Sequence, residues 1–464
     1  MTRTHLLGAV SAAALACIST AAFATTATIV VGGASLPAVD YQYEMTNYNN
    51  TKLASALAFG NSFSAPAVYG TQGSGAGLAG VIYNNLQCIA TNNCGKTTDV
   101  APKFNPQTGA GGVNVTHMAG SDSPLSADQF NIWAGTYTGT TSYTTNFGAS
   151  TAGNLIQLPS LGVGIAIVIK NSAMTSNGQI TLTDDQICGI FSGKLSDWSQ
   201  VNSALIPGAI TVNYRSDGSG TSAIFTQHLA AVCNATNSNF SVSNLASVTT
   251  DAATGLSIGT TTFSKLFIGL TTPFATTPVG SSGSSGVYGS LGGQSSSIGY
   301  LSPDYTSLTT VIPSNTLVVA AVQGKGETAG TTPTTTSITK GLASAGTGAA
   351  HAAPPAQAAA NTVDAWVPLV PVVTSGYPIV GYTTFVFPQC YANANVAKGV
   401  KAFLKLHYKA PVYQAIQSTN GFVTVQGTAA AKYVPAILAN VLANTNGWNY
   451  DINNATACFG KGGR

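Results

Sequence analysis

Short apolar runs followed by glycine-rich turns recur along the chain, and each turn leads into a segment of helical character. The pattern occurs in ATIVVGGASLPAVDYQYEM near the start, and again at residues 65–83, 114–133 and 210–233. Each case predicts a strand, a loop and a helix, and Ser126 is a good N-cap for the helix that begins ADQFNIW. Strands that alternate with helices indicate an α/β fold with mostly parallel sheets.

Further patterns extend this assignment through the second half of the chain. IQLPSLGVGIAIVIK at 156–170 is a near-continuous apolar run, as expected for a strand buried on both faces. TLTDDQICGIFSGKLSDW at 181–198 predicts a short helix that ends at Gly193. Residues 326–360 are a linker candidate because of their Thr, Ala, Gly and Pro content, although SITKGLASAG within them could form a short capped helix. The segment 364–391 is strand-like, and two amphipathic helices follow it.

Composition narrows the class of protein. The chain has 464 residues, of which 44% are hydrophobic and 7% charged, and its formal net charge is +3. This length predicts two or three domains with full-sized cores. No cluster of Lys and Arg is present, so we expect no nucleic-acid partner, because affinity for a phosphate backbone comes from such clusters. The 18 Tyr and 17 Phe argue for a folded chain rather than a disordered one.

The N-terminal segment predicts export. Arg3 and His5 precede an apolar run that ends in Ala-Phe-Ala at 22–24, which is typical of a secretory signal peptide over residues 1–24. A lipoprotein acylated at Cys17 is the alternative, although the usual Leu three positions earlier is missing. No other stretch approaches an uninterrupted span of about 20 apolar residues. We therefore expect a protein of the periplasm or the extracellular space.

Six cysteines remain after the predicted signal peptide. An even number in an exported chain favours disulfides, and six cysteines allow 15 pairings. Metal binding is the alternative, but no histidine lies near the first two cysteines and the other four are scattered, so we expect no metal site. Pairing neighbours in sequence gives Cys88–Cys94, Cys188–Cys233 and Cys390–Cys458.

The loop YRSDGSGTSAIFTQHL at 214–229 has the makings of an anion site. A strand delivers Arg215, and Ser219, Gly220 and Thr221 then lie at the N-terminus of a helix. Free backbone N–H groups, two hydroxyls, the positive end of the helix dipole and a guanidinium would point to one place. Asp217 would orient the guanidinium. The alternative is a surface turn with an ordinary N-cap and a local ion pair.

Three other glycine loops lie between a strand and a helix start. They present Ser35 in GGASLPA, Ser74 in GSGAG and Asp122 in AGSDSPL, and each could contribute to a cleft at the carboxyl ends of strands. Taken singly, each is an ordinary turn. A carboxylate such as Asp122 is unfavourable in an anion site unless the anion brings a proton to donate. Hydrogen phosphate has such a proton and sulfate does not.

Motifs for catalysis are weak or missing. One G-x-G-x-x-G match at 75–80 is weak evidence for a dinucleotide, and the sequence contains neither a P-loop nor a G-x-S-x-G elbow. His117 and His228 form no recognisable nucleophile–base pattern with a serine, and we expect both to be packing or surface residues. We therefore expect no catalytic residues, no cofactor and no enzymatic activity.

Taken together, the motifs resemble one family. They are VVGGASLP, QGSGAG, AGSDSPLS, CGIFSGKLSDW, YRSDGSGTSAIFTQHL, IGYLSPDY and SGYPIVGYTTFVF, in order from about Ile29 to Cys458. The set is similar to the periplasmic phosphate-binding proteins of ABC transporters, and especially to their secreted DING subfamily. Residues 29–32 replace the four letters that name that subfamily, and the arginine loop is closer to that of the transport proteins.

The resemblance implies a two-lobed α/β periplasmic-binding-protein fold (type II), with a hinge and a phosphate cleft between the lobes. Residues 25–159 and 380–464 would form the first lobe, and residues 160–379 the second. Cys188–Cys233 and Cys390–Cys458 match cysteines of DING proteins, whereas Cys88–Cys94 would be additional. The implied phosphate ligands are Ser35, Leu36, Ser74 and Asp122 from the first lobe and Arg215, Ser219, Gly220 and Thr221 from the second.

We therefore expect a monomeric, high-affinity binding protein for inorganic phosphate that serves uptake or scavenging. An ABC transporter permease is a possible partner. Two alternatives stay open: a secreted phosphatase or phosphoesterase of the same fold, and an extracellular structural or adhesive protein in which the anion site only stabilises the fold.

Overall fold

The computed structural model of the chain provides a description of most of the mature sequence. The described residues are 29–59, 67–71, 73–83, 116–139, 148–172, 180–203, 205–234, 238–240, 249–250, 257–267, 274–305, 317–344, 353–370 and 373–464. The predicted signal peptide and the predicted disulfide Cys88–Cys94 lie outside them.

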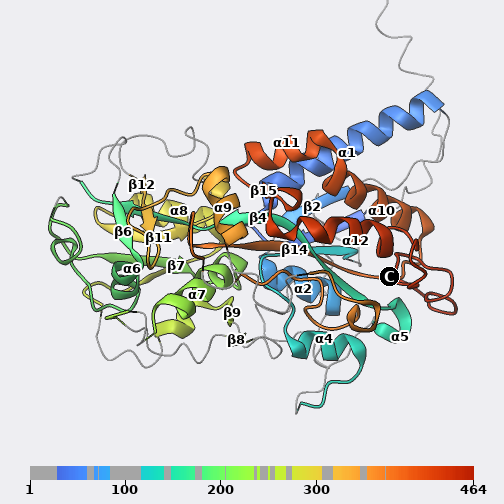
Figure 1. Cartoon of the computed structure of the whole chain (residues 1–464), viewed down its shortest axis with the longest axis horizontal. Helices are drawn as coiled ribbons and strands as arrows, with labels where there is room; N and C mark the ends of the chain where they lie inside the picture. The colour runs from blue at the N-terminus through green and yellow to red at the C-terminus, as the bar shows by residue number, and fades with distance from the viewer. Residues whose placement is uncertain are drawn as a thin grey trace, which may run out of the picture.

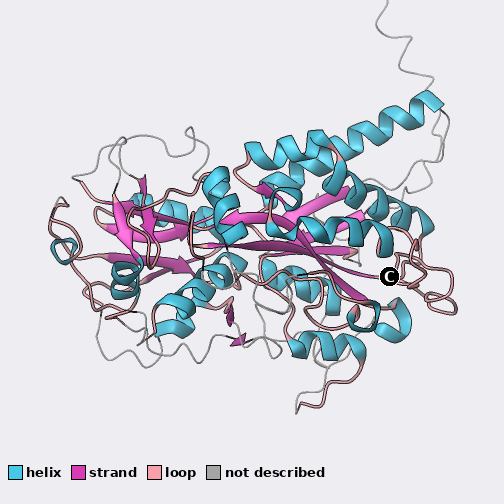
Figure 2. Ribbon diagram, in the orientation of Figure 1, coloured by secondary structure: helices cyan, strands magenta, loops and turns pink. Residues whose placement is uncertain are grey.

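Two β-sheets, each covered by helices, occupy opposite halves of an elongated molecule (Figures 1 and 2). The first sheet has the order β15-β4-β14-β3-β1-β2, with strands β1 (Ile29–Gly33), β2 (Ala67–Thr71), β3 (Met118–Ser121), β4 (Leu155–Gly164), β14 (Val380–Pro388) and β15 (Val423–Thr424). The second has the order β10-β7-β11-β5-β12, with β5 (Ala166–Lys170), β7 (Thr211–Arg215), β10 (Val279–Ser281), β11 (Ser297–Leu301) and β12 (Val318–Val319). Two small ladders pair β6 (Thr181–Thr183) with β13 (Ala321–Gln323), and β8 (Thr249–Thr250) with β9 (Ser257–Gly259).

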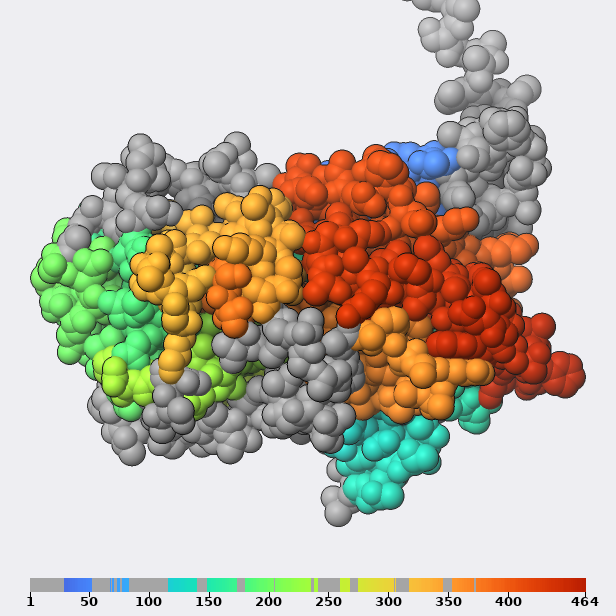
Figure 3. Space-filling view, in the orientation of Figure 1, coloured from blue at the N-terminus to red at the C-terminus, as the bar shows by residue number. Residues whose placement is uncertain are grey.

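Helices from both ends of the chain cover the first sheet. They are α1 (Ala38–Phe59), α2 (Ser74–Tyr83), α4 (Ala127–Ala134), α5 (Ala149–Ala152), α10 (Ala394–Lys409), α11 (Pro411–Thr419) and α12 (Tyr433–Asn440). The other half contains α6 (Asp184–Phe191), α7 (Gly220–Val232) and α8 (Gly283–Gly293), while α9 (Thr335–Ser344) contacts β4 and β14. Short 3-10 helices lie at Trp198–Gln200, Phe263–Phe267, Pro303–Tyr305, Gln357–Ala359, Val425–Gly427 and Ala429–Lys432. Figure 3 shows the amber segment around residues 320–344 in contact with the red-orange C-terminal segments of the first half.

In the described residues, two connections join the strands of the two sheets, and Trp366, from the segment before β14, also packs against Tyr450 of the first half. The chain leaves the first sheet at the end of β4, enters the second with β5, and returns at the start of β14. The two connections are neighbours, because the backbone N–H of Ile165 donates to the carbonyl of Ile379 at 2.9 Å. The lobe boundaries expected at 159/160 and 379/380 stay a prediction, although β4 pairs within the first sheet as far as Gly164.

Two expectations from the apolar pattern were wrong. The sheets are mixed rather than mostly parallel: β1 runs parallel to β2 and β3, and β7 to β10 and β11, but β4, β14 and β15 pair antiparallel, as do β5, β11 and β12. The antiparallel pair β4–β14 arises because these strands carry the chain between the halves in opposite directions. The run 156–170 is accordingly two buried strands in different sheets, not one.

Several local predictions are confirmed. Ser126 caps α4 in a capping box with Gln129, and α6 ends just before Gly193, whose φ of 76° suits glycine. The helical alternative for SITKGLASAG is correct for its first eight residues, which form the C-terminal part of α9, and Ile338 and Leu342 of that helix are buried.

Two disulfides are present in the described chain, and each joins elements of one half. Cys188 of α6 is bonded to Cys233 at the end of α7, and Cys390 after β14 to Cys458 near the C-terminus. Both are the pairs that neighbouring cysteines give. Within the described residues no helix is both long and apolar enough to cross a membrane.

Candidate anion-binding site

Three of the predicted loops meet at the carboxyl ends of neighbouring strands in the first sheet. The strands β3, β1 and β2 are parallel neighbours, so their carboxyl ends lie side by side. Ser35 follows β1, Ser74 is the first residue of α2 after β2, and Asp122 follows β3. The structure therefore brings together the three first-lobe loops that the sequence pattern singled out.

Glycines allow these loops to pack backbone against backbone. Gly33 has a φ of +141°, and a Cβ on it would lie 2.1 Å from the carbonyl oxygen of Gly120. A Cβ on Gly77 would lie 2.5 Å from the Cα of Gly33, and the N–H of Gly73 donates to the Gly33 carbonyl at 2.7 Å. Side chains at these positions would separate the loops, so the glycine spacing is a packing requirement.

In the second half, β7 ends at Arg215 and α7 begins five residues later. The Arg215 side chain is buried and donates twice to Asp217, from Nε to Oδ1 at 2.7 Å and from one terminal nitrogen to Oδ2 at 2.5 Å. Its other terminal nitrogen donates to the hydroxyl of Ser284 at 3.2 Å. Ser219 is the N-cap of α7 and accepts from the N–H of Ser222 at 3.2 Å. The predicted orienting pair and the predicted helix N-terminus are both present.

Asp217 is held as a carboxylate. Burial alone raises its pKa, but the hydrogen bonds and positive charge of Arg215, together with the N–H of Gly283 at 3.0 Å from Oδ1, outweigh burial and lower the pKa. The negative charge of Asp217 is therefore matched to the guanidinium, whose orientation it fixes.

The loops of the two halves touch each other. The Ser74 hydroxyl donates to Asp122 Oδ2 and accepts from the N–H groups of Asp122 and Gly220, each at 3.2 Å. A Cβ on Gly220 would lie only 2.2 Å from the Cβ of Asp122. The N-terminus of α7 thus abuts the carboxylate loop of the other half, with no room for a side chain between them.

The remaining predicted residues differ in how closely they join this cluster. Thr221, the second residue of α7, is buried, and its hydroxyl has no hydrogen-bond partner in the described part of the chain. Ser35 is half-buried, and Leu36, in the turn between β1 and α1, is fully buried. Neither Ser35 nor Leu36 has a described hydrogen bond to the loops that carry Ser74, Asp122 and Gly220. A buried hydroxyl such as that of Thr221 calls for a partner, which an anion could supply.

Sequence reasoning missed two residues that support the arginine. Ser284 lies in the first turn of α8, directly after a short strand, so its Ser/Gly-rich surroundings repeat the strand–loop–helix signal of the other loops. The Tyr300 hydroxyl accepts from the backbone N–H of Arg215 at 3.1 Å and is 2.6 Å from the hydroxyl of Ser222. Burial raises the pKa of Tyr300, which keeps it protonated. Nothing in the sequence around Tyr300 indicates this contact.

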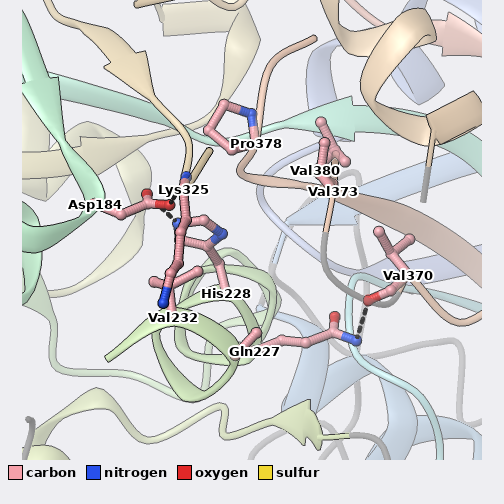
Figure 4. A pocket seen from close by; sticks show the side chains of 10 residues that line it. Asp184, Gln227, His228, Val232, Lys325, Val370, Val373, Pro378 and Val380 are labelled. Carbon is pink, nitrogen blue, oxygen red and sulfur yellow. Dashed lines mark hydrogen bonds and ion pairs between the residues drawn. The ribbon is translucent and has the colours of Figure 1, made fainter. Parts of the chain in front are cut away.

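The two histidines weighed as catalytic bases serve other contacts. His228 lies in a small pocket beside α7, where its Nε2 is 2.9 Å from Asp184 Oδ1 (Figure 4). None of the described residues that line this pocket carries a hydroxyl or thiol, so the ring has no serine, threonine or cysteine nucleophile there. The buried His117 accepts from the N–H of Val30 at its Nδ1, at 2.9 Å. In the described residues no three His, Cys, Asp or Glu side chains form a group that could hold a metal ion.

Known proteins match this chain over nearly its whole length. A family model described as a PBP superfamily domain matches residues 45–409. The chain belongs to the PBP superfamily. The chain is 30% identical to "Alkaline phosphatase L" of Pseudomonas aeruginosa, over 99% of both chains. It is 32% identical to a "Phosphate-binding protein" from an unknown prokaryotic organism, over 79% of this chain and 90% of that protein.

Solved structures of the same superfamily share the fold. A high-affinity periplasmic phosphate-binding protein (PfluDING), solved with bound phosphate, is 28% identical, with a TM-score of 0.68 over 94% of this chain and 99% of its own. A crystal structure of a DING protein is 27% identical, with a TM-score of 0.67 over the same shares. These matches confirm the predicted resemblance and the two-lobed periplasmic-binding-protein fold. The loops described above therefore lie where the two lobes meet.

Proposed function

We propose that this protein binds inorganic phosphate with high affinity in the cleft between its lobes, for phosphate uptake or scavenging. The observation that carries the proposal is the meeting of Asp122 with the N-terminus of α7 at Ser74. A helix N-terminus favours an anion. A carboxylate at the same place favours an anion that can donate a proton.

The proposed ligands are the predicted ones. Arg215, the hydroxyls of Ser219 and Thr221 and the N–H of Gly220 would bind phosphate oxygens from the second lobe. Ser35, the backbone of Leu36 and Ser74 would do so from the first lobe, with Ser74 exchanging a present hydrogen bond for one to phosphate. The buried hydroxyl of Thr221, which has no described partner, supports this set.

Asp122 would distinguish phosphate from sulfate. Its carboxylate accepts the hydrogen of hydrogen phosphate or dihydrogen phosphate. Sulfate carries no proton near neutral pH, so it would place two negatively charged oxygens against each other. Sites that require one specific hydrogen bond reject analogues that lack it by roughly 10⁴-fold or more.

A phosphatase is the second candidate, because the relative named "Alkaline phosphatase L" matches across both chains. Phosphoester hydrolysis needs an activated nucleophile or a metal site. Within the described residues Ser74 bonds only to Asp122 and to the N–H of Gly220, and Ser219 caps its helix. Neither serine is paired with a histidine, so the geometry supports binding better than catalysis.

Export and partners follow from the same proposal. The predicted signal peptide over residues 1–24 and the two disulfides support a periplasmic or secreted protein. In the periplasm a monomer would deliver phosphate to an ABC transporter permease.

The direct test is to identify the anion that the purified protein carries. Mild denaturation of the full mature chain should release phosphate, close to one per chain, and no sulfate. Titration calorimetry of the refolded, anion-free protein should then give tight binding of phosphate and much weaker binding of sulfate. Absence of phosphate binding would point to the structural or adhesive alternative. Phosphomonoester turnover that Ser219→Ala abolishes would instead establish the phosphatase.

A further inference from the structure

A buried polar network lies on the two strands that connect the lobes. Along the β4–β14 ladder Thr383 pairs with Leu161 and Thr384 pairs with Pro159. Ser160 is therefore an extra residue on β4, which makes a β-bulge. A bulge interrupts the ladder and leaves backbone groups without a cross-strand partner, so something else must satisfy them.

His407 of α10 supplies the missing partner. Its Nε2 is 3.0 Å from the carbonyl oxygen of Ser160 and 3.0 Å from the Ser160 hydroxyl. Because a carbonyl oxygen only accepts, Nε2 carries a proton. On the other side of the ring, Nδ1 is 2.7 Å from Glu44 Oε2, and Gln417 Nε2 donates to Glu44 Oε1 at 2.6 Å. The short contact between Nδ1 and Oε2 is a hydrogen bond, so one proton lies between these two atoms.

The order serine, histidine, glutamate resembles that of a catalytic triad, but this one is closed to substrate. The three side chains are at most 1% exposed. The Ser160 hydroxyl also receives a hydrogen bond from Tyr41 at 2.8 Å. With no access from solvent, the cluster positions other parts of the protein rather than reacting.

Tyr41 extends the network across both connecting strands, β4 and β14, and toward the loops that carry Ser35 and Asp122. Its hydroxyl joins Ser160 on β4 to Thr383 on β14, the second contact being 3.0 Å long. Its ring packs edge-on against Tyr69, with ring centres 5.2 Å apart. The Tyr69 hydroxyl donates to the carbonyl of Ala34 at 2.6 Å, directly before Ser35.

The same two rings lie against the loop that carries Asp122. A Cβ on Gly120 would lie 2.8 Å from the Tyr69 hydroxyl and 2.9 Å from a Tyr41 ring carbon. Burial raises the pKa of Tyr69, and the negative charge of Asp122 raises it further. The two tyrosine rings are thus close enough to interact electrostatically with Asp122 and to hold the backbone at Gly120.

We propose that His407 is a positioning residue for phosphate binding. Paired with Glu44, it holds the bulge at Ser160, and through Tyr41 it sets the position of the connecting strands relative to the loops of Ser35 and Asp122. The inference rests on the proposed function, since it explains how the loops of Ser35 and Asp122 are held in position relative to β4 and β14.

The experiment compares inorganic phosphate binding by the full mature chain with that of His407→Gln, Tyr41→Phe and the double variant. Each single change should raise Kd roughly 3- to 30-fold, the range for coupling through packed networks. The double variant should be no worse than the weaker-binding single variant, because both changes break one network. Kd is measured by calorimetry on folded protein, and the phosphate dissociation rate by stopped flow. Melting temperature is recorded for every variant.

Lys401→Met is the matched control, because Lys401 lies on the same helix but pairs with Asp451 at 3.0 Å rather than with the Ser160 network. It should lower the melting temperature without changing Kd. If His407→Gln and Tyr41→Phe behave like this control, their role is structural and the inference is wrong. Should His407→Gln fail to fold, Tyr41→Phe decides alone, since it keeps the ring and loses one hydroxyl. If the unaltered chain binds no phosphate, the proposed function is wrong and this inference with it.

Discussion

Two aspartates follow strands that end where the two lobes meet, and their surroundings differ sharply. Both carboxylate oxygens of Asp217 accept from Arg215, and one also accepts the N–H of Gly283. Asp122 instead receives the hydroxyl of Ser74 and abuts the first residue of α7. One carboxylate therefore orients a cation within its own lobe, whereas the other faces the helix N-terminus of the opposite lobe. Under the proposed function, the second lobe would attract the anion and the first would identify it.

The largest effect is expected from Asp122→Asn. The amide can donate to an anion oxygen, so sulfate no longer meets a negative charge. A phosphate-over-sulfate preference of roughly 10⁴ should fall to about 10² or less. Titration calorimetry with both anions measures the ratio. An unchanged preference would show that Asp122 does not identify the anion.

Arg215→Met should weaken both anions together. Hydrogen bonds to charged groups contribute about 1.5–3 kcal/mol each, so affinity for phosphate should fall roughly 10- to 150-fold with the preference over sulfate kept. Arg215→Lys retains the charge but loses the planar fork, so its affinity for phosphate should lie between those of the unaltered chain and Arg215→Met. A changed preference in Arg215→Met would contradict the division between the lobes.

The α/β fold and the positions of the main site residues at the ends of strands could be predicted from the sequence. The strand–glycine–helix signal predicted that Ser35, Ser74, Asp122 and Arg215 lie at the ends of strands. Such loops are recognisable because glycines and helix-capping residues follow a short apolar run. Ser219 was identified as the start of α7 for the same reason. The mixed sheets were not predicted, since a buried strand reads as an apolar run whichever direction its neighbours take.

Contacts between distant segments were beyond the reach of pattern reasoning. Tyr300 bonds to the backbone of Arg215 over 85 residues, and His407 bonds to Ser160 over 247. A lone Tyr or His in an apolar stretch carries no local mark of such a partner. The apolar run at 156–170 likewise concealed both the break at Ile165 and the bulge at Ser160, because every residue from 155 to 169 is buried.

Closure between the two loops can be tested with one methyl group. In Gly220→Ala the new Cβ would clash with Asp122 where the two loops touch, so phosphate affinity should fall about fivefold or more, since overpacking costs about 1–3 kcal/mol. If the two loops separate in the anion-free protein, its stability should not fall, since alanine is the better helix former by up to about 1 kcal/mol. Gly289→Ala is the control: it lies within α8 with nothing within 4 Å of its Cβ, and should leave Kd unchanged. Equal affinity in both variants would mean that the loops do not touch in the bound state.

The smallest effect concerns Asp217 and is measured as the stability of the anion-free protein. Its pKa in the folded protein is lowered from 3.8, so the ionised form is favoured by folding. That contribution is present above pH 3.8 and is lost as pH falls through the lowered pKa. In phosphate-free protein, Asp217→Asn should reduce the free energy of unfolding by on the order of 1 kcal/mol at pH 7, a modest value because the pair is partly exposed. Urea unfolding at pH 7, 5 and 3 should show the difference from the unaltered chain shrinking below pH 4. A difference that stays constant over this range would mean that Asp217 acts through shape alone, and that the charge of Arg215 is balanced elsewhere in the cleft.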